Sequence, residues 1–270
     1  KGQVLSLSPR KNTFLRWNVK GRCPQLLASN LDYLILVTTP DEPPFRPRFI
    51  DRALCQAEHQ GITPIVVCNK FDLAEQMQTD GRIDEYEEIE KRLNIWQDLG
   101  YKVLKISAKT GEGMPEFANL LEGKLSAFVG QSGVGKSSLI NVLDNTCVLK
   151  TGSLSKKYGR GSHTTTKGTL IHLSINEALT DGIKGVKANI IDTPGIRRFV
   201  LDDIEADDLA LYFREFENLV GKCNFGMSCT HITEPGCRIK EAVENGEITP
   251  ERYDSWKRIR NEIKTGSWED

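Results

Sequence analysis

The chain alternates short apolar runs with longer segments of helical periodicity. Five apolar runs stand out between residues 31 and 192: "YLILVT" (33–38), "PIVVCN" (64–69), "KVLKIS" (102–107), "SAFVGQ" (126–131) and "ANIIDT" (188–193). Apolar residues at helical spacing occupy 49–60 and 84–99. Strands without polar alternation are typical of a parallel sheet that is covered on both faces. The pattern therefore predicts an α/β domain built on a parallel sheet.

Both ends of the chain carry a different pattern. "NTFLRWNV" (12–19) alternates as a half-exposed strand does, and residues 1–28 contain basic side chains but no acid. This arm is either a solvated strand or the edge of a small β-barrel that touches RNA. Beyond residue 201, "DDIEADDLALYFREF" (202–216) and "ITPERYDSWKRIRNEIK" (248–264) predict helices, the second with Thr249 as N-cap. We expect three regions: 1–28, 29–200 and 201–270.

Composition restricts the partners and the cellular compartment that we expect for the protein. The net charge of −1 provides no global basic field, so RNA binding would depend on local patches. No apolar run approaches the roughly 18–20 residues that span a bilayer, so we expect no membrane contact. Seven cysteines, an odd number, favour a reducing compartment, and we expect a cytoplasmic protein. Because the chain starts at Lys1, we expect it to be a fragment, which leaves organellar targeting open.

A phosphate-binding motif follows the fourth apolar run. "GQSGVGKSS" (130–138) matches the pattern G-x-x-x-x-G-K-[ST] between an expected strand and an expected helix. Lys136 can neutralise the β- and γ-phosphates, and the Ser137 hydroxyl can bind Mg²⁺. The backbone of the loop would cradle phosphate oxygens through Gly130, Ser132, Gly133, Val134, Gly135 and Ser138. The motif predicts a nucleoside triphosphate site.

Two further motifs indicate guanine. "NKFD" (69–72) ends the second apolar run, where Asp72 can accept both N–H groups of the guanine edge, which adenine does not offer. Asn69 can brace neighbouring loops, and Lys70 can lie over the base. "SAKTGEG" (107–113) follows the third run, and the Ala108 N–H can meet the guanine 6-oxo group. We add the flanking residues of that motif, Ser107 and Lys109, to the base site.

The two switch regions of a GTPase are also present. In "DTPG" (192–195), Asp192 can act as the Mg²⁺-linked carboxylate and the Gly195 N–H can meet the γ-phosphate. Upstream lies the loop "GRGSHTTTKGT" (159–169), in which one threonine can complete the Mg²⁺ shell; we favour Thr165. His163 is either the group that positions water or a loop histidine that contacts solvent or RNA.

The motifs occur in a rotated order: base, base, phosphate, switch I, switch II. Loops at one edge of a sheet keep their places when the chain is cut elsewhere and the old ends are joined, so the site is predicted to be intact. Switch II then leads directly into the C-terminal region, which we expect to couple the two. Ile196 stands where many GTPases carry glutamine, so we expect slow intrinsic hydrolysis and acceleration by a partner.

A metal-binding pattern lies near the C-terminus. Cys223, Cys229, His231 and Cys237 fall within "CNFGMSCTHITEPGC". Three thiolates and one imidazole suit a closed, tetrahedral Zn²⁺ site. Such a metal would stabilise a tail that is too small to form a good core.

The order NKFD, SAK, GQSGVGKSS, HTTT and DTPG, followed by Cys-x5-Cys-x-His-x5-Cys, resembles the RsgA (YjeQ) family of circularly permuted GTPases over essentially the whole chain. The resemblance implies an OB-fold, of which residues 1–28 would be the last part, then a permuted GTPase domain over 29–200 and a zinc-binding helical domain over 201–270. It also implies that the protein binds the small ribosomal subunit and its rRNA late in assembly and hydrolyses GTP when the subunit stimulates it. The cofactors would be GTP or GDP, Mg²⁺ and Zn²⁺, and we expect a monomer.

Two alternatives stay open at this stage. A GTP-regulated binding module with negligible turnover is compatible with Ile196. A P-loop kinase is disfavoured, because "NKFD" and "SAK" would then have no role.

Overall fold

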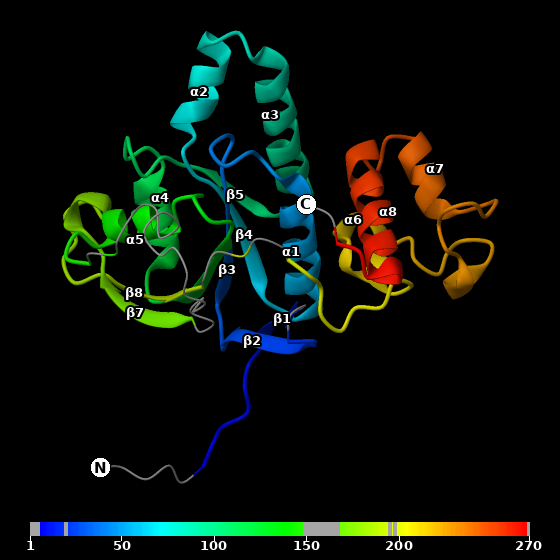
Figure 1. Cartoon of the computed structure of the whole chain (residues 1–270), viewed down its shortest axis with the longest axis horizontal. Helices are drawn as coiled ribbons and strands as arrows, with labels where there is room; N and C mark the ends of the chain where they lie inside the picture. Colours follow the sequence, from blue (N-terminus) through cyan, green and yellow to red (C-terminus); the bar gives the residue numbers. More distant parts are fainter. Residues whose placement is uncertain are drawn as a thin grey trace.

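The computed structural model of the chain describes residues 6–18, 21–147, 149, 168–193, 196 and 199–268. At its centre lies a sheet whose described strands follow the order β5-β4-β3-β6-β8-β7 (Figure 1). The parallel strands are β3 (Tyr33–Thr38), β4 (Thr63–Cys68), β5 (Lys102–Lys105), β6 (Leu125–Gly130) and β8 (Lys187–Asp192). The five predicted strands are therefore confirmed, with small differences at their ends.

The sixth strand, β7 (Thr169–Ser174), runs antiparallel to β8 at the edge of the sheet. It is not among the five apolar runs, because most of its side chains are exposed and its sequence, "TLIHLS", includes polar residues. An edge strand needs only one buried face, so it lacks the continuous apolar signal of the central strands.

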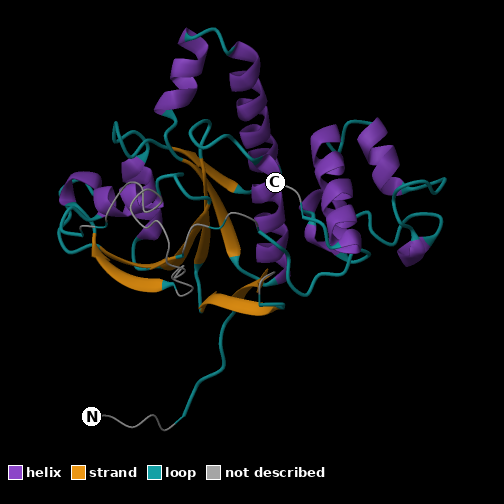
Figure 2. Ribbon diagram, viewed as in Figure 1, coloured by secondary structure: helices purple, strands orange, loops and turns teal. Residues whose placement is uncertain are grey.

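Helices cover both faces of the sheet (Figure 2). One face carries α1 (Pro47–His59), α2 (Asp72–Thr79) and α3 (Ile83–Asp98), and the other carries α4 (Met114–Leu121) and α5 (Lys136–Leu143). Successive strand residues serve opposite layers: Leu34 and Leu36 pack towards α1, whereas Ile35 and Val37 pack towards α4 and α5. The helices α2 and α3 form a hairpin that projects beyond the sheet (Figure 1).

The N-terminal strands β1 (Thr13–Asn18) and β2 (Cys23–Ser29) form an antiparallel hairpin. Phe14 is buried and stacks on Phe199, with ring centroids 5.9 Å apart, and the Trp17 N–H donates to the Val200 carbonyl at 3.1 Å. The strand predicted at 12–19 is confirmed. The hairpin is thereby attached to the segment that leads from β8 to the tail.

The tail packs against α1 (Figure 1). Its elements are η2 (Leu209–Tyr212), α6 (Arg214–Glu217), η3 (Gly226–Ser228), α7 (Arg238–Glu244) and α8 (Pro250–Thr265); a further short turn, η1 (Glu177–Leu179), precedes β8. Helix α8 is confirmed, with the Thr249 side chain accepting from the Arg252 N–H as N-cap. Among the described residues, no helix is long and apolar enough to cross a bilayer.

The helix predicted over 202–216 is wrong. Only a 3₁₀ turn and one short α-helical turn form there, and Phe213 between them is extended, with φ −104° and ψ 111°. Tertiary packing overrides the helical pattern: Phe213 is fully buried, and the Arg252 guanidinium lies 4.4 Å from its ring centre.

A neutral amide pairing holds the start of the tail. The Gln56 Nε2 donates to the Asp202 carbonyl at 3.0 Å, and the Asp202 N–H donates to Gln56 Oε1 at 2.7 Å. Gln56 belongs to α1, in which residues 49–57 are all buried between the sheet and the tail. The backbone of Asp202 is therefore occupied by a side chain rather than by a helix.

Candidate nucleotide site and metal centre

Asn69 joins the loops that follow the central strands. Its side chain is buried; Nδ2 donates to the Val134 carbonyl at 2.9 Å and Oδ1 accepts from the Ala108 N–H at 3.1 Å. Its own N–H donates to the Thr38 carbonyl at 2.9 Å. One amide side chain therefore ties "NKFD" and "SAKTGEG" to the phosphate loop, although these motifs lie far apart in the chain.

Asp72 is the first residue of α2, and neighbouring side chains fix the position of its carboxylate. The Ser107 hydroxyl donates to its Oδ1 at 2.7 Å, and the Lys109 ammonium lies 3.5 Å from its Oδ2. The Lys70 Nζ donates to the Glu42 carbonyl at 2.5 Å. A Cβ at Gly135 would lie 4.0 Å from Lys70 Cε, so the lysine stem extends beside the phosphate loop.

Glycine is required at two points of the phosphate loop. Gly135 has φ +92°, and a Cβ there would come within 2.3 Å of the Asn69 amide nitrogen. A Cβ on Gly130 would lie 2.4 Å from the Val37 carbonyl oxygen. Any side chain would separate the strands or break the Asn69 bridge, so these glycines allow the close approach that a phosphate cradle needs.

Lys136 begins α5 and is buried. Its Nζ donates to the carbonyls of Gly130 (2.8 Å) and Gln131 (3.0 Å). Burial lowers the pKa of Lys136 to about 8, against the opposing effect of Asp192, and burial raises the pKa of Asp192 against the effect of Lys136. Within the described part of the chain the lysine therefore bonds neutral carbonyls, and anionic phosphate oxygens would be stronger partners for it.

The predicted base and phosphate residues lie at one edge of the sheet. In the described part of the chain these are Asn69, Lys70, Asp72, Ser107, Ala108, Lys109, Gly130, Ser132, Gly133, Val134, Gly135, Lys136, Ser137, Ser138 and Asp192. Strand β8 places Asp192 opposite Phe128 of β6, close to the start of the phosphate loop. His163, Thr165 and Gly195 lie outside the described residues.

Ile196 lies next to the phosphate loop and is turned into the protein. Its N–H donates to the Gly130 carbonyl at 3.2 Å, and its side chain is 2% exposed within the core on the α1 side of the sheet. The side chain therefore has neither the chemistry nor the orientation to position water.

Sequence reasoning missed one group of residues around this site. Asp41, Glu42, Pro43 and Arg82 line its flank through contacts described below. These residues belong to no recognised motif, so only their three-dimensional contacts show them.

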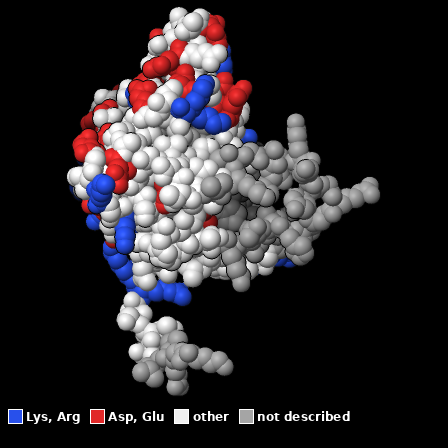
Figure 3. Space-filling view, turned by 90° about the vertical axis from the view of Figure 1, so that its left-hand side faces the viewer, with Lys and Arg blue, Asp and Glu red and all other residues white. Residues whose placement is uncertain are grey.

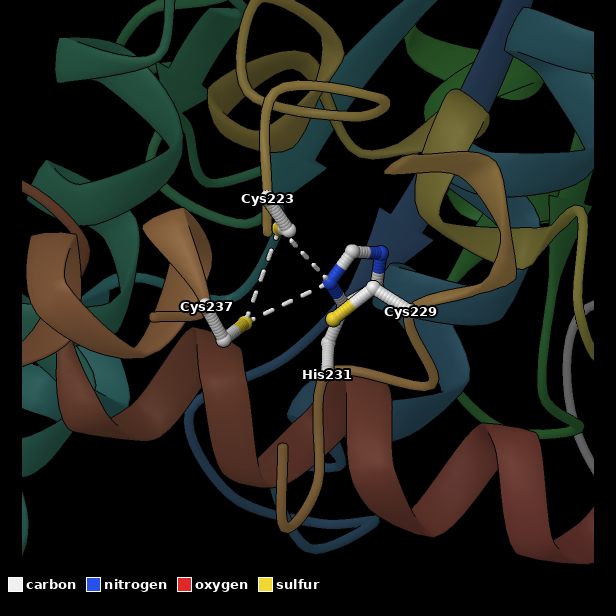
Figure 4. Close-up of side chains that lie close together, drawn as sticks. All are labelled: Cys223, Cys229, His231 and Cys237. Carbon is white, nitrogen blue, oxygen red and sulfur yellow. Dashed lines mark hydrogen bonds between the residues drawn. The ribbon is translucent and has the colours of Figure 1, made fainter. Parts of the chain in front are cut away.

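The four predicted metal ligands lie around a common centre (Figure 4). The ligand atoms of Cys223, Cys229, His231 and Cys237 all lie within 4.8 Å of one another. His231 Nδ1 is 3.5 Å from Cys223 Sγ and 3.4 Å from Cys237 Sγ, and those two sulfur atoms are 3.8 Å apart. A tetrahedral ion with Zn–S of about 2.3 Å and Zn–N of about 2.0–2.1 Å requires separations of about 3.6 Å and about 3.8 Å. The donor set therefore fits Zn²⁺.

Surrounding groups fix the orientation of these ligands. The Tyr253 hydroxyl donates to the His231 carbonyl at 2.6 Å, and Trp256 lies edge-on to the His231 ring at 6.0 Å. The Arg238 N–H donates to Cys223 Sγ at 3.3 Å, a hydrogen bond that would stabilise a zinc-bound thiolate. Both aromatic residues come from α8, so the centre joins the zinc loop to that helix.

Comparison with known proteins agrees with this geometry. The model of the family described as "RsgA GTPase" matches residues 7–202. The chain is 41% identical over 259 residues to "Small ribosomal subunit biogenesis GTPase RsgA" of Haemophilus influenzae, covering 96% of this chain and 68% of the relative. It is 39% identical over 255 residues to the protein of that name from Borreliella burgdorferi, covering 94% and 75%.

Two solved structures share the fold. YjeQ from Thermotoga maritima matches with a TM-score of 0.70 and 32% identity, covering 96% of this chain and 77% of that chain. YloQ, described as a circularly permuted GTPase, matches with a TM-score of 0.68 and 28% identity, covering 97% and 75%. With its base-reading loops ahead of its phosphate loop on one sheet, the chain belongs to the RsgA GTPase family.

Proposed function

We propose that the protein binds GTP at the carboxyl edge of its sheet and hydrolyses it during biogenesis of the small ribosomal subunit. The observation that carries this proposal is the Asn69 bridge, which sets a guanine-reading loop and a phosphate loop in one frame. The names of the relatives support the process, and the family supports GTP hydrolysis.

Each motif has a distinct part in binding. The Asp72 carboxylate accepts the two guanine N–H groups, and the 6-oxo group shares the Ala108 N–H with Asn69 Oδ1. Lys70 lies along the base, while Lys136 and the backbone of residues 130–138 hold the phosphates. A site that leaves a buried carboxylate unpaired with adenine discriminates strongly against ATP.

The hydroxyls of Ser137 and Thr165 and the carboxylate of Asp192 are the groups we assign to Mg²⁺. Hard oxygen donors of this kind suit that ion, and when bound it neutralises charge on the β- and γ-phosphates. The Gly195 N–H is assigned to the γ-phosphate.

We infer that intrinsic hydrolysis is slow and that the ribosomal particle accelerates it. The side chain of Ile196 is buried and apolar, so another group has to orient the attacking water. His163 is our candidate for that group, and a partner-supplied contribution can reach about 10³–10⁵ in rate. Replacing His163 with Ala should remove the stimulated rate while GDP affinity stays unchanged; full stimulated turnover would exclude a catalytic role.

The partner is the small subunit with its rRNA, and the setting is a bacterial-type cytoplasm, since the relatives named above are bacterial. Arg16 of β1 and the basic side chains of α8 support contact with phosphates. We further propose structural Zn²⁺, a monomer without membrane contact, an N-terminal OB-fold that ends near residue 28, and domain boundaries near residues 28 and 200.

The deciding experiment measures phosphate release from GTP across a panel of ribosomal particles. Strong stimulation by small subunits, and none by large subunits, is the expected result. Nucleotide-dependent binding of small subunits without stimulated turnover would favour the second candidate, a binding switch, for which the buried Ile196 is the supporting observation.

A further inference from the structure

The segment between β3 and α1, residues 39–46, forms one flank of the nucleotide site. We call it the flanking loop. Its Glu42 carbonyl accepts the Lys70 ammonium at 2.5 Å, and Pro43 Cδ lies 3.5 Å from the position of a Cβ on Gly133. The flanking loop thus touches both the base-reading motif and the phosphate loop.

Backbone conformation marks this contact as constrained. Glu42 has φ +49° and Lys70 has φ +58°. Residues with a side chain disfavour this left-handed region and persist in it where neighbouring groups hold them. Here the two partners of a single hydrogen bond both adopt it, so the contact between them depends on the groups that fix each backbone.

An ion pair from outside the site fixes the Glu42 side of the contact. The Glu42 N–H donates to Asp41 Oδ1 at 2.9 Å, and Arg82 Nη1 donates to Asp41 Oδ2 at 2.7 Å. The hydrogen bond from Arg82 holds the pKa of the Asp41 carboxyl below its usual value, so the carboxylate stays charged. The Thr39 hydroxyl, donating to the Pro43 carbonyl at 2.8 Å, closes the other end of the turn.

Arg82 belongs to the turn between α2 and α3. Two of its nitrogens bond Glu85 at 2.8 and 2.6 Å, which orients the third nitrogen towards Asp41. Helix α2 runs from Asp72 to Thr79, so it links the residue proposed to read guanine to the turn that carries Arg82. Charged side chains crowd around this projecting hairpin, whereas the middle of the same face is largely uncharged (Figure 3).

We propose that Asp41 and Arg82 form a latch that positions Lys70 over the guanine base and thereby sets the lifetime of the bound nucleotide. Neither side chain is assigned a contact with nucleotide; both act through the Glu42 carbonyl and Lys70. The inference rests on the proposed guanine site. With the latch open, Lys70 loses its fixed partner and the base dissociates faster.

The expected effect is modest, because the pair is partly exposed: the Arg82 side chain is 39% exposed and that of Asp41 29%. Pairs of this kind change an equilibrium or rate by about two- to fivefold. We expect Arg82→Ala and Asp41→Asn each to raise the dissociation rate of fluorescent mant-GDP by about that factor. The double variant should dissociate no faster than either single variant, because each change opens the same latch.

The test is a stopped-flow displacement of mant-GDP from the full chain by excess GDP. Glu116→Gln is the control, since it removes the charge of Glu116 from the more exposed Lys102–Glu116 pair, which lies outside the nucleotide site. In a Lys70→Met background, Arg82→Ala should have no further effect, which a merely structural role for Arg82 would not explain. Raised salt should speed release more in the wild type than in Arg82→Ala, because the Asp41–Arg82 pair is screened only in the wild type.

The possible results distinguish a failure of the proposed guanine nucleotide site from a failure of the Asp41–Arg82 latch. A wild-type chain that binds no mant-GDP overturns the proposed function itself. If the wild type binds mant-GDP but the Asp41 and Arg82 variants release it at the wild-type rate, the latch is refuted and the proposed function stands. Additive effects of Arg82→Ala and Lys70→Met would also overturn it, because the arginine would then act by another route.

Discussion

Arg252 of α8 is the centre of the contact between the tail and the sheet domain. Its side chain is 1% exposed, and its guanidinium pairs with Asp51 of α1 and, at 2.6 and 3.3 Å, with Glu215 of α6. Burial alone would lower the pKa of Arg252, but the two carboxylates hold it above its usual value. The group is therefore charged and fully paired in the interior.

We expect Arg252→Met to lower the free energy of unfolding by about 3–5 kcal/mol, because it leaves buried carboxylates without their cation. Asp51 keeps two donors, Trp96 Nε1 at 2.8 Å and the Ser255 hydroxyl at 2.6 Å, so a value near the lower end is expected. Neutralising the carboxylates as well, in Arg252→Met with Asp51→Asn and Glu215→Gln, should restore part of the loss.

Urea unfolding followed by tryptophan fluorescence measures this change, since Trp96 and Trp256 lie on either side of the contact. The zinc concentration is held constant throughout. Arg258→Met is the matched control: Arg258 is an exposed residue of the same helix, paired with Asp254 at 2.7 Å, and its loss should change stability by at most about 0.5 kcal/mol. If Arg252→Met destabilises the protein by less than about 1 kcal/mol, the charges are not buried in the way described.

Three further predictions concern the guanine-binding residue Asp72, the zinc ligand Cys229 and the phosphate-binding residue Lys136. Asp72→Ala should lower GDP affinity by several kcal/mol and remove the preference over ADP; calorimetry with both nucleotides measures this, and retained preference would place guanine recognition elsewhere. Cys229→Ser should reduce bound zinc from one ion per chain and lower the unfolding temperature of the tail; metal analysis showing no zinc in the wild type would contradict the assignment. Because burial lowers the pKa of Lys136 to about 8, whereas phosphates favour its charged form, nucleotide binding takes up a proton above that pH. GDP affinity should therefore fall as pH rises from about 8, by up to about tenfold per unit, and calorimetry at pH 9 that detects no proton uptake would refute this.

The sequence was most informative where burial is continuous. Strands β3, β4 and β6 are apolar at most of their buried positions, with Thr38 and Ser126 as polar exceptions, so a simple run of residues predicts them. The motif loops follow from the same pattern, because each begins where such a strand ends. The zinc ligands were predictable from spacing, since a metal accepts a small set of side chains.

Sequence patterns could not predict contacts between residues that lie far apart in the chain. The extended backbone at Phe213 depends on Arg252, and the Asp41–Arg82 pair joins two segments that belong to no motif. The sequence over 202–216 does have helical periodicity. In the structure, however, the Asp202 N–H donates to the Gln56 side chain and Phe213 is buried in the core, so these residues are stabilised without a continuous helix.

The amide pairing between Gln56 and Asp202 also bears on how the tail can respond to nucleotide. Both hydrogen bonds join uncharged groups in the interior, so neither ionic strength nor pH weakens them as it would a surface ion pair. The backbone of Asp202, at the start of the tail, is therefore fixed directly to α1 and does not depend on switch II for its position. A reorientation of the tail must either carry α1 along as one rigid body or break these two hydrogen bonds, so the tail cannot move as a loosely tethered unit.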